Sequence, residues 1–170
     1  MTAASFPADV TDRDGLTDAL ADASAHFGGI NVLEYSPAAR NAVDIREVTR
    51  ADVAAQLDHH LYGAMSAADA VLPAMLDAGA GTLLFTTGIT SVDPWPEYGN
   101  VGIGAAALRN WSVNLGKGLA GTGVTVAHVA IGVWIGDSAP DGYGHLPATE
   151  IASRFYALHQ AQTSNDLIIS

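Results

Sequence analysis

A chain of 170 residues with 49 % hydrophobic and 15 % charged residues has the composition of a single globular domain, residues 1–170. Its net charge of −11 disfavours nucleic acid and anionic membrane surfaces as partners. The lack of cysteine excludes disulfides and thiolate chemistry, and no apolar run approaches the roughly 20 residues of a membrane-spanning helix. The first residues hold no basic cluster followed by an apolar stretch, so we expect a cytoplasmic protein.

The first part of the chain predicts a strand, a surface helix and a buried strand. Residues 3–8 are apolar and short, and a proline among them favours the edge or the end of a strand. Thr11 and Asp14 have the spacing of a capping box, and apolar residues then recur on one helical face until a pair of glycines ends the pattern. Residues 30–35 are the next apolar run and predict a buried strand.

A polar loop at residues 38–48 leads to a long predicted helix. Thr49 and Asp52 repeat the capping spacing, and the helical pattern continues to about residue 77. Pro73 is expected to kink the last turns, because proline removes a backbone donor and its ring crowds the preceding turn.

The second half of the chain predicts a βαβ unit. Apolar strands at residues 82–87 and 124–131 are joined by a long apolar helix at 101–119. A loop rich in Gly, Pro and Asp follows at 136–147, then a helix that Thr149 can cap and a short edge strand at the end of the chain. This alternation predicts a three-layer α/β domain, in which a parallel sheet carries helices on both faces.

Five segments occur in a particular order and spacing: residues 8–12, 29–33, 72–75, 106–109 and 123–126. In this combination the chain resembles the short-chain dehydrogenase/reductase family. The resemblance implies a Rossmann-like fold and an NAD(P)-linked oxidoreductase. Family members begin with a strand, a glycine-rich turn and a helix that hold the cofactor pyrophosphate. The match starts at the third strand of the family, so the expected sheet is truncated at its N-terminal end.

The resemblance also assigns catalytic positions, where the residues differ from those of the family. The family's Tyr and Lys align with Val101 and Ala105. Its Ser aligns with Gly88, and the Asn of its proton relay aligns with His60. Lys117 is the only lysine, and no tyrosine has a lysine four residues further on. Because hydride transfer in this family needs the Tyr phenol as an acid activated by that Lys, family-typical hydride transfer is not expected.

The positions that would contact NAD(P) follow from the same resemblance. Asp9 and Val10 would flank the adenine ring, and Ser36 lies in the segment that ends the second predicted strand. Ile131 and Val133 flank the turn that would meet the nicotinamide. Without the glycine-rich turn, we expect these contacts to be vestigial.

Three side chains could instead form a new acid/base site in the vacated pocket. His60 could serve as an acid or base, because a histidine ordinarily changes charge near neutral pH, and Tyr35 stands at the carboxyl end of a strand, where α/β sheets bind ligands. Tyr98 could reach the same pocket from a loop. Such a site would suit a lyase, isomerase or cyclase, and the alternative is that these residues only fill the core. The acidic residues and histidine of loop 136–147 have no metal-ligand spacing, so no metal site is predicted.

Two further hypotheses concern partners. Members of the family pair through their two long helices, here about 50–77 and 101–119, so the chain is expected to form a homo-oligomer or to associate with an active relative. The residues expected to keep that surface apolar are Leu57, Leu61, Leu108, Trp111 and Leu115. Alternatively, the missing nucleotide-binding half is supplied elsewhere and the chain works as an NAD(P)-linked enzyme. In either case strand 30–35 loses its family neighbour, so we expect residues 3–8 or a second molecule to cover its edge.

Overall fold

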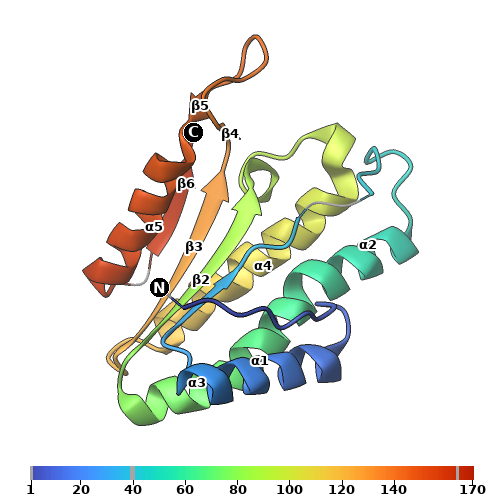
Figure 1. Ribbon diagram of the computed structural model, residues 1–170. Coiled ribbons are helices and arrows are strands. Elements are labelled where there is room, and N and C mark those ends of the chain that lie inside the picture. The colour runs from blue at the N-terminus through green and yellow to red at the C-terminus, as the bar shows by residue number, and fades with distance from the viewer. Residues whose placement is uncertain (1, 39–40, 164) are drawn as a thin grey trace.

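The computed structural model describes residues 2–38, 41–163 and 165–170, and its centre is a parallel sheet of four strands (Figure 1). In order across the sheet, the strands are β1 (Val32–Tyr35), β2 (Gly81–Gly88), β3 (Val124–Ile131) and β6 (Asn165–Ile169). Two short strands, β4 (Trp134–Ile135) and β5 (His145–Leu146), pair at the base of the loop that follows β3. The predicted parallel α/β sheet is therefore confirmed.

The helices alternate with these strands. They are α1 (Arg13–Phe27), α2 (Arg50–Leu57), α3 (Gly63–Ala78), α4 (Gly99–Gly118) and α5 (Ala148–Ala161). A π-helical turn, η1 (Asp58–Tyr62), joins α2 to α3, and two 3₁₀ turns, η2 (Ile89–Ser91) and η3 (Pro96–Tyr98), lie between β2 and α4. The chain thus repeats the order strand, helix, strand that puts loops at the carboxyl ends of the strands.

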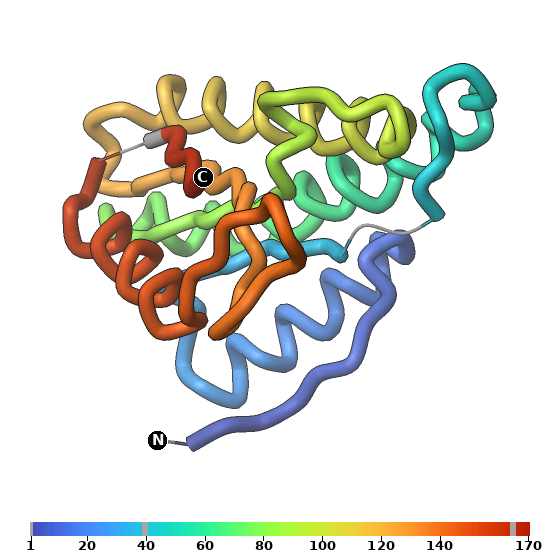
Figure 2. The backbone as a smooth tube through the Cα atoms, turned by 90° about the horizontal axis from the view of Figure 1, so that it is seen from above, coloured from blue at the N-terminus to red at the C-terminus, as the bar shows by residue number. Residues whose placement is uncertain are grey.

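Two apolar cores hold the three layers together. The helices α3 and α4 pack on one face of the sheet and α5 packs on the other, as the view from above shows (Figure 2). Helix α1 packs against α3, beside β1. Fully buried residues of the first core include Phe85, Leu108, Leu83 and Ala64, and the second core contains Ala127, Val129 and Ile169.

The helix starts follow capping chemistry, although two of the three predicted caps are wrong. The capping box at Thr49 and Asp52 is confirmed, because each side chain accepts a hydrogen bond from the backbone N–H of the other residue. The first helix is capped instead by Asp12, whose carboxylate accepts a hydrogen bond from the Gly15 backbone N–H at 3.2 Å. The last helix begins directly after Pro147, so Thr149 lies inside its first turn and is not the cap.

The long helix predicted over 49–77 departs from α geometry at an unexpected place. It runs from Arg50 to Ala78 and continues through Pro73, but it contains the π turn at Asp58–Tyr62. A π turn inserts one extra residue into a helix and is common at functional sites. Here the inserted turn carries His59 and His60.

The N-terminal segment does not extend the sheet, so the prediction of a strand at residues 3–8 is wrong. Phe6 packs instead against the rings of His26 and Phe27 at the end of α1, with centroid distances of 5.8 and 6.3 Å. Within the described residues, β1 is an edge strand. Its outward residues Val32 and Glu34 are exposed, because alternate residues of a strand face opposite sides.

Candidate active site

A cavity of about 170 Å³ lies at the carboxyl end of β2, beside the π turn and the start of α4. It brings together all four positions that the family resemblance assigns to catalysis: Gly88, Val101, Ala105 and His60. Val101 and Ala105 are 3 % and 1 % exposed and turn small apolar groups toward the cavity. Three of the four positions therefore have no group that can transfer a proton, and His60 is the exception.

The imidazole of His60 is buried and neutral at pH 7. Its Nδ1 lies 3.2 Å from the Gln56 carbonyl oxygen, which can only accept, so Nδ1 carries the proton and Nε2 is unprotonated. Burial lowers the pKa of His60 to about 4, and the neighbouring His59 acts in the same direction. The ring is 3 % exposed and lines the cavity, so it can accept a proton or a hydrogen bond there but has none to donate from Nε2.

Aromatic side chains form the other wall of this cavity. Tyr98 lines it as the sequence predicted, together with Trp95, which sequence reasoning missed. The ring of Trp95 lies 6.0 Å from that of Tyr98 and 6.4 Å from that of Tyr143, which belongs to the loop after β3. An indole in a Pro-rich loop carries no periodic signal, so its position could not be obtained from the pattern of the sequence.

Tyr35 is not placed in the cavity. Its hydroxyl donates a hydrogen bond of 2.6 Å to the backbone oxygen of His59, and the ring belongs to the first core. Burial raises the pKa of Tyr35, which makes the phenol a poorer acid than an exposed tyrosine. The structure therefore gives Tyr35 the role of fixing the π turn against β1.

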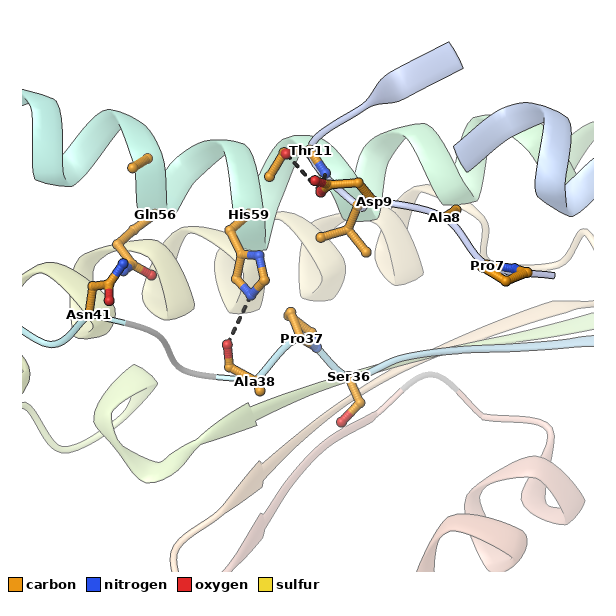
Figure 3. Close-up of a pocket in the computed structure, with 12 residues that line it drawn as sticks. Pro7, Ala8, Asp9, Thr11, Ser36, Pro37, Ala38, Asn41, Gln56 and His59 are labelled. Carbon is orange, nitrogen blue, oxygen red and sulfur yellow. Dashed lines mark hydrogen bonds between the residues drawn. The ribbon is translucent and has the colours of Figure 1, made fainter. Parts of the chain in front are cut away.

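A larger groove of about 800 Å³ opens beyond the edge of β1 (Figure 3). Asp9, Val10 and Ser36, three of the five positions that the family resemblance assigns to the cofactor, line it. The Nε2 of His59 lies 2.9 Å from the carbonyl oxygen of Ala38 across it. Its other lining residues are Pro7, Ala8, Thr11, Pro37, Asn41, Ala55 and Gln56.

The remaining two cofactor positions are elsewhere. Ile131 is the last residue of β3, Val133 follows the strand, and both pack against the second core, which also includes residues of α5. Among the described residues that line the groove there is no lysine or arginine, whereas Asp9 brings a negative charge to it. The described lining therefore offers a dinucleotide no cation for its phosphate groups.

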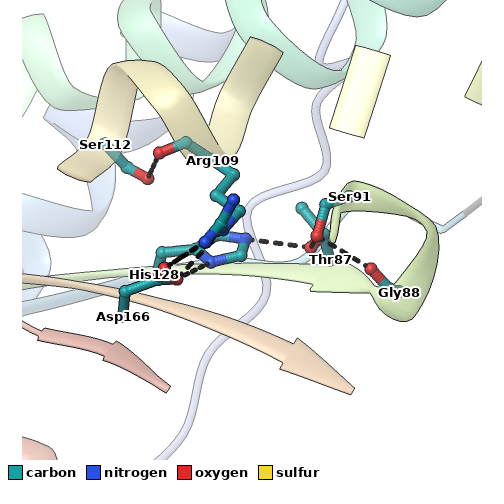
Figure 4. A network of polar contacts seen from close by, with 7 residues as sticks. All are labelled: Thr87, Gly88, Ser91, Arg109, Ser112, His128 and Asp166. Atoms are coloured by element: carbon teal, nitrogen blue, oxygen red, sulfur yellow. Dashed lines mark hydrogen bonds and ion pairs between the residues drawn. The ribbon is translucent and has the colours of Figure 1, made fainter. Parts of the chain in front are cut away.

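A partly buried polar network connects β6 to the turn after β2 (Figure 4). The guanidinium of Arg109 binds Asp166, which lies 2.8 Å from Nδ1 of His128. Nε2 of His128 lies 2.9 Å from the hydroxyl of Thr87, which contacts Ser91. The sequence offered one signal for this network, a lone histidine in an apolar strand, but its partners are far away in the chain.

Neither a metal centre nor a membrane span is found in the part of the chain that the structure describes. No three His, Cys, Asp or Glu side chains among those residues gather closely enough to hold a metal ion. None of the described helices combines the length and the apolar character that crossing a bilayer requires.

Comparison with known proteins agrees with this architecture. A family model described as enoyl-(acyl carrier protein) reductase matches residues 1–160. A sulfoacetaldehyde reductase of Chromohalobacter salexigens is 29 % identical over 127 residues, which are 74 % of this chain and 50 % of that protein. An uncharacterized oxidoreductase of Staphylococcus aureus is 25 % identical over 127 residues, which cover 75 % of this chain and 55 % of the relative. The chain thus spans about half the length of these curated relatives.

Solved structures share the fold at low sequence identity. A short-chain dehydrogenase from Streptomyces avermitilis superposes with a TM-score of 0.79 at 20 % identity, over 96 % of this chain and 69 % of the other. The L-sorbose reductase of Gluconobacter frateurii, complexed with NADPH and L-sorbose, gives a TM-score of 0.80 at 16 % identity over 97 % and 74 % of the two chains. At these identities the likeness concerns the fold alone.

Proposed function

Because this chain belongs to the short-chain dehydrogenase/reductase family, we propose that it is a degenerate member that keeps the family's fold and does not transfer hydride by itself. The observation that carries the proposal is the composition of the small cavity. Its lining contains Gly88, Val101 and Ala105 where the family resemblance calls for a proton-transferring set. Reduction of a carbonyl places negative charge on its oxygen, so an acid must protonate that oxygen or a fixed cation must stabilise its charge.

The other groups near the cavity do not replace the missing acid. The unprotonated Nε2 of His60 accepts a hydrogen bond but cannot donate one at pH 7. Tyr98 has Gly102 four residues further on, so no ammonium group is placed to activate its phenol. A carbonyl oxygen in this cavity would therefore gain little stabilisation as its charge develops.

Weak cofactor binding is the second part of the proposal. Relatives with the same fold are known in complex with NADP or NADPH. In this chain the described lining of the groove that holds Asp9, Val10 and Ser36 has one carboxylate and no lysine or arginine, and the whole molecule carries a net charge of −11. Both features oppose the binding of a ligand that itself carries phosphate groups.

A cofactor titration tests the proposal directly. We expect no saturable change in calorimetric heat or tryptophan fluorescence with NADH or NADPH up to about 1 mM, which corresponds to a binding free energy weaker than about 4 kcal/mol. The sorbose reductase, assayed in parallel, serves as a positive control. Consumption of NADPH in step with reduction of a ketone by the purified chain would overturn the proposal.

Pairing through α2, α3 and α4 is proposed as the way in which the chain associates with itself or with an active relative. The residues that sequence analysis assigned to this surface need revision. Leu108 is fully buried in the first core, and Trp111 stacks edge-on against Phe85 at 5.2 Å. Leu115 also packs against that core, so the apolar contribution of α4 to a partner comes instead from Ile103, which is 39 % exposed.

Substituting Ile103 tests this surface. Ile103→Glu should weaken self-association about tenfold or more, because it places a charge at the centre of the contact. Ile168→Glu is the matched control, since Ile168 is 41 % exposed and lies on β6, outside these helices. Sedimentation velocity over a concentration series gives the dissociation constants. If Glu34→Pro weakens association and Ile103→Glu does not, the edge of β1 is the interface.

A repurposed acid/base enzyme is the second candidate function, and one observation favours it. His60 faces the cavity and not the solvent, and Tyr98 lines the same cavity. A neutral imidazole and a phenol there would suit proton abstraction from a small carbonyl compound, as in an isomerase or a lyase. A pH-dependent activity that disappears in His60→Ala and survives in His59→Ala would establish this function. Equal activity of the wild type and His60→Ala would exclude it.

A further inference from the structure

Four short polar contacts run in sequence from the edge strand β6 to the turn after β2 (Figure 4). Asp166 Oδ1 lies 2.8 Å from Nδ1 of His128, whose Nε2 lies 2.9 Å from Oγ1 of Thr87. That hydroxyl lies 2.8 Å from Oγ of Ser91, which lies 3.0 Å from the carbonyl oxygen of Gly88. All four are hydrogen-bond distances, so each contact requires one proton between its two heavy atoms.

In their usual forms at pH 7, these groups carry too few protons for the four contacts. An ionised carboxylate and a peptide carbonyl carry none, a neutral imidazole carries one, and the hydroxyls of Thr87 and Ser91 carry one each. The four contacts need four protons, and the groups bring three. Rotating either hydroxyl moves the deficit to another contact without removing it, and two lone pairs then face each other across that contact.

We propose that this network holds one additional proton at pH 7, as an imidazolium at His128 that donates from both ring nitrogens, and that loss of the proton releases the turn Ile89–Ser91. The proton belongs on the ring because Arg109 holds Asp166 in its ionised form through both Nε and Nη2. With Nε2–H donating to Thr87, that hydroxyl is free to donate onward. Ser91 then donates to the backbone, and all four contacts are satisfied.

The charged groups that face His128 come from two elements. Asp166 is its ladder partner on β6, and Arg109 binds Asp166 from α4. Lys117, also on α4, lines a surface cavity together with Arg109 and Asp166. Burial, the largest effect, brings the pKa of His128 below its usual value, and the charge of Arg109 acts in the same direction, whereas Asp166 opposes both by hydrogen bonding and by charge. The imidazolium is assigned from the proton count of the four contacts, against this net shift. From β2 comes only the uncharged Thr87, and the two hydroxyl contacts beyond the ring add to the stabilisation of the imidazolium.

When His128 loses its additional proton, the contact that breaks is the one whose side chain is least restrained by the surrounding structure. His128 has ladder partners on both β2 and β6, Thr87 pairs with Ala130 of β3, and Asp166 is held by Arg109. Ser91 lies in the 3₁₀ turn η2, outside the sheet, so it is the member that can move.

Movement of this turn would alter two cavities. Ser91 lines an apolar cavity of about 330 Å³ together with Trp95 and Tyr98. Its neighbour Thr90 lines both that cavity and the smaller one that holds His60. Protonation of His128, a residue of the central strand β3, would thus control the wall of the candidate site.

Nitrogen-15 NMR of the histidine rings tests the proposal without any ligand. At pH 7 we expect both ring nitrogens of His128 to have the chemical shifts of protonated nitrogen. Raising the pH should deprotonate one of them, and the exchange rate of the Ser91 amide should rise with the same midpoint. Thr87→Val removes the acceptor of Nε2–H and should lower that midpoint by about one to two pH units, the value of a hydrogen bond to a charged group.

The neighbouring Thr86→Val is the matched control, because the hydroxyl of Thr86 donates to Glu34 and not to the network. It should leave the midpoint of His128 unchanged. An unprotonated ring nitrogen in His128 throughout the range from pH 5 to pH 7 would overturn the proposal. So would a midpoint that Thr87→Val does not lower, or an amide of Ser91 whose exchange does not follow the titration.

Discussion

Acidification from pH 6.5 to pH 4 is expected to remove about 3 kcal/mol of folding free energy through His60 alone. The folded-state pKa is about 4 and the ordinary value is 6.5, so below pH 6.5 the unfolded chain binds the proton more tightly than the folded chain. Stability is therefore fully present above pH 6.5, falls as the pH falls, and is lost once the pH passes the folded pKa. Because the ring is 3 % exposed, solvent screens this effect little.

Urea denaturation over a pH series measures this loss, and a pair of substitutions isolates it. His60→Asn removes the titrating group and should flatten the profile between pH 6.5 and pH 4. His59→Asn removes the neighbouring ring, which is only partly buried, and should keep most of the wild-type slope because His60 remains. Equal slopes for the wild type and His60→Asn would show that the imidazole is not the source of the acid sensitivity.

Gly63→Ala should cost about 3 kcal/mol, although alanine normally stabilises a helix relative to glycine. A Cβ at this position would clash with the hydroxyl of Tyr35 and lie 2.7 Å from the backbone oxygen of Val10. The tyrosine would have to give up its 2.6 Å hydrogen bond to His59. Overpacking contributes about 1–3 kcal/mol and the lost buried hydrogen bond about 1–3 kcal/mol.

The same substitution elsewhere gives the control for Gly63→Ala. At Gly118, near the end of α4, nothing lies within 4 Å of an added Cβ, so Gly118→Ala should be neutral or slightly stabilising. In a double-mutant cycle, Tyr35→Phe should relieve part of the cost of Gly63→Ala, since it removes the clashing oxygen. Additive effects in thermal or chemical unfolding would mean that the hydroxyl and Gly63 do not oppose each other.

Local patterns predicted most of the fold. The runs of apolar residues at 82–87 and 124–131 gave buried strands, and the capping box at Thr49 gave the start of a helix. These features depend on residues within about ten positions of each other, which a pattern can detect. The family resemblance then placed His60, Val101 and Ala105, and the structure brings them into one cavity.

Long-range contacts account for what the sequence did not predict. His128 meets Asp166 38 positions away and Thr87 41 positions away, and no periodicity links them. The extended path of residues 3–8 depends on the packing of Phe6 against the end of α1, which outweighs a weak strand preference. Tyr35 likewise fixes the π turn through its hydrogen bond to the His59 carbonyl, and no local sequence pattern predicted that turn.

The negative charge of the protein also opposes aggregation through the edge strand β1. Backbone groups along an unpaired strand can pair with another copy, and mutual repulsion keeps copies apart only over a screening distance of about 8 Å at physiological ionic strength. That repulsion vanishes near the isoelectric point of about 4.6, inside the pH range in which His60 also weakens the fold. Mild acid therefore removes colloidal protection and conformational stability together, so precipitation should begin before unfolding is complete.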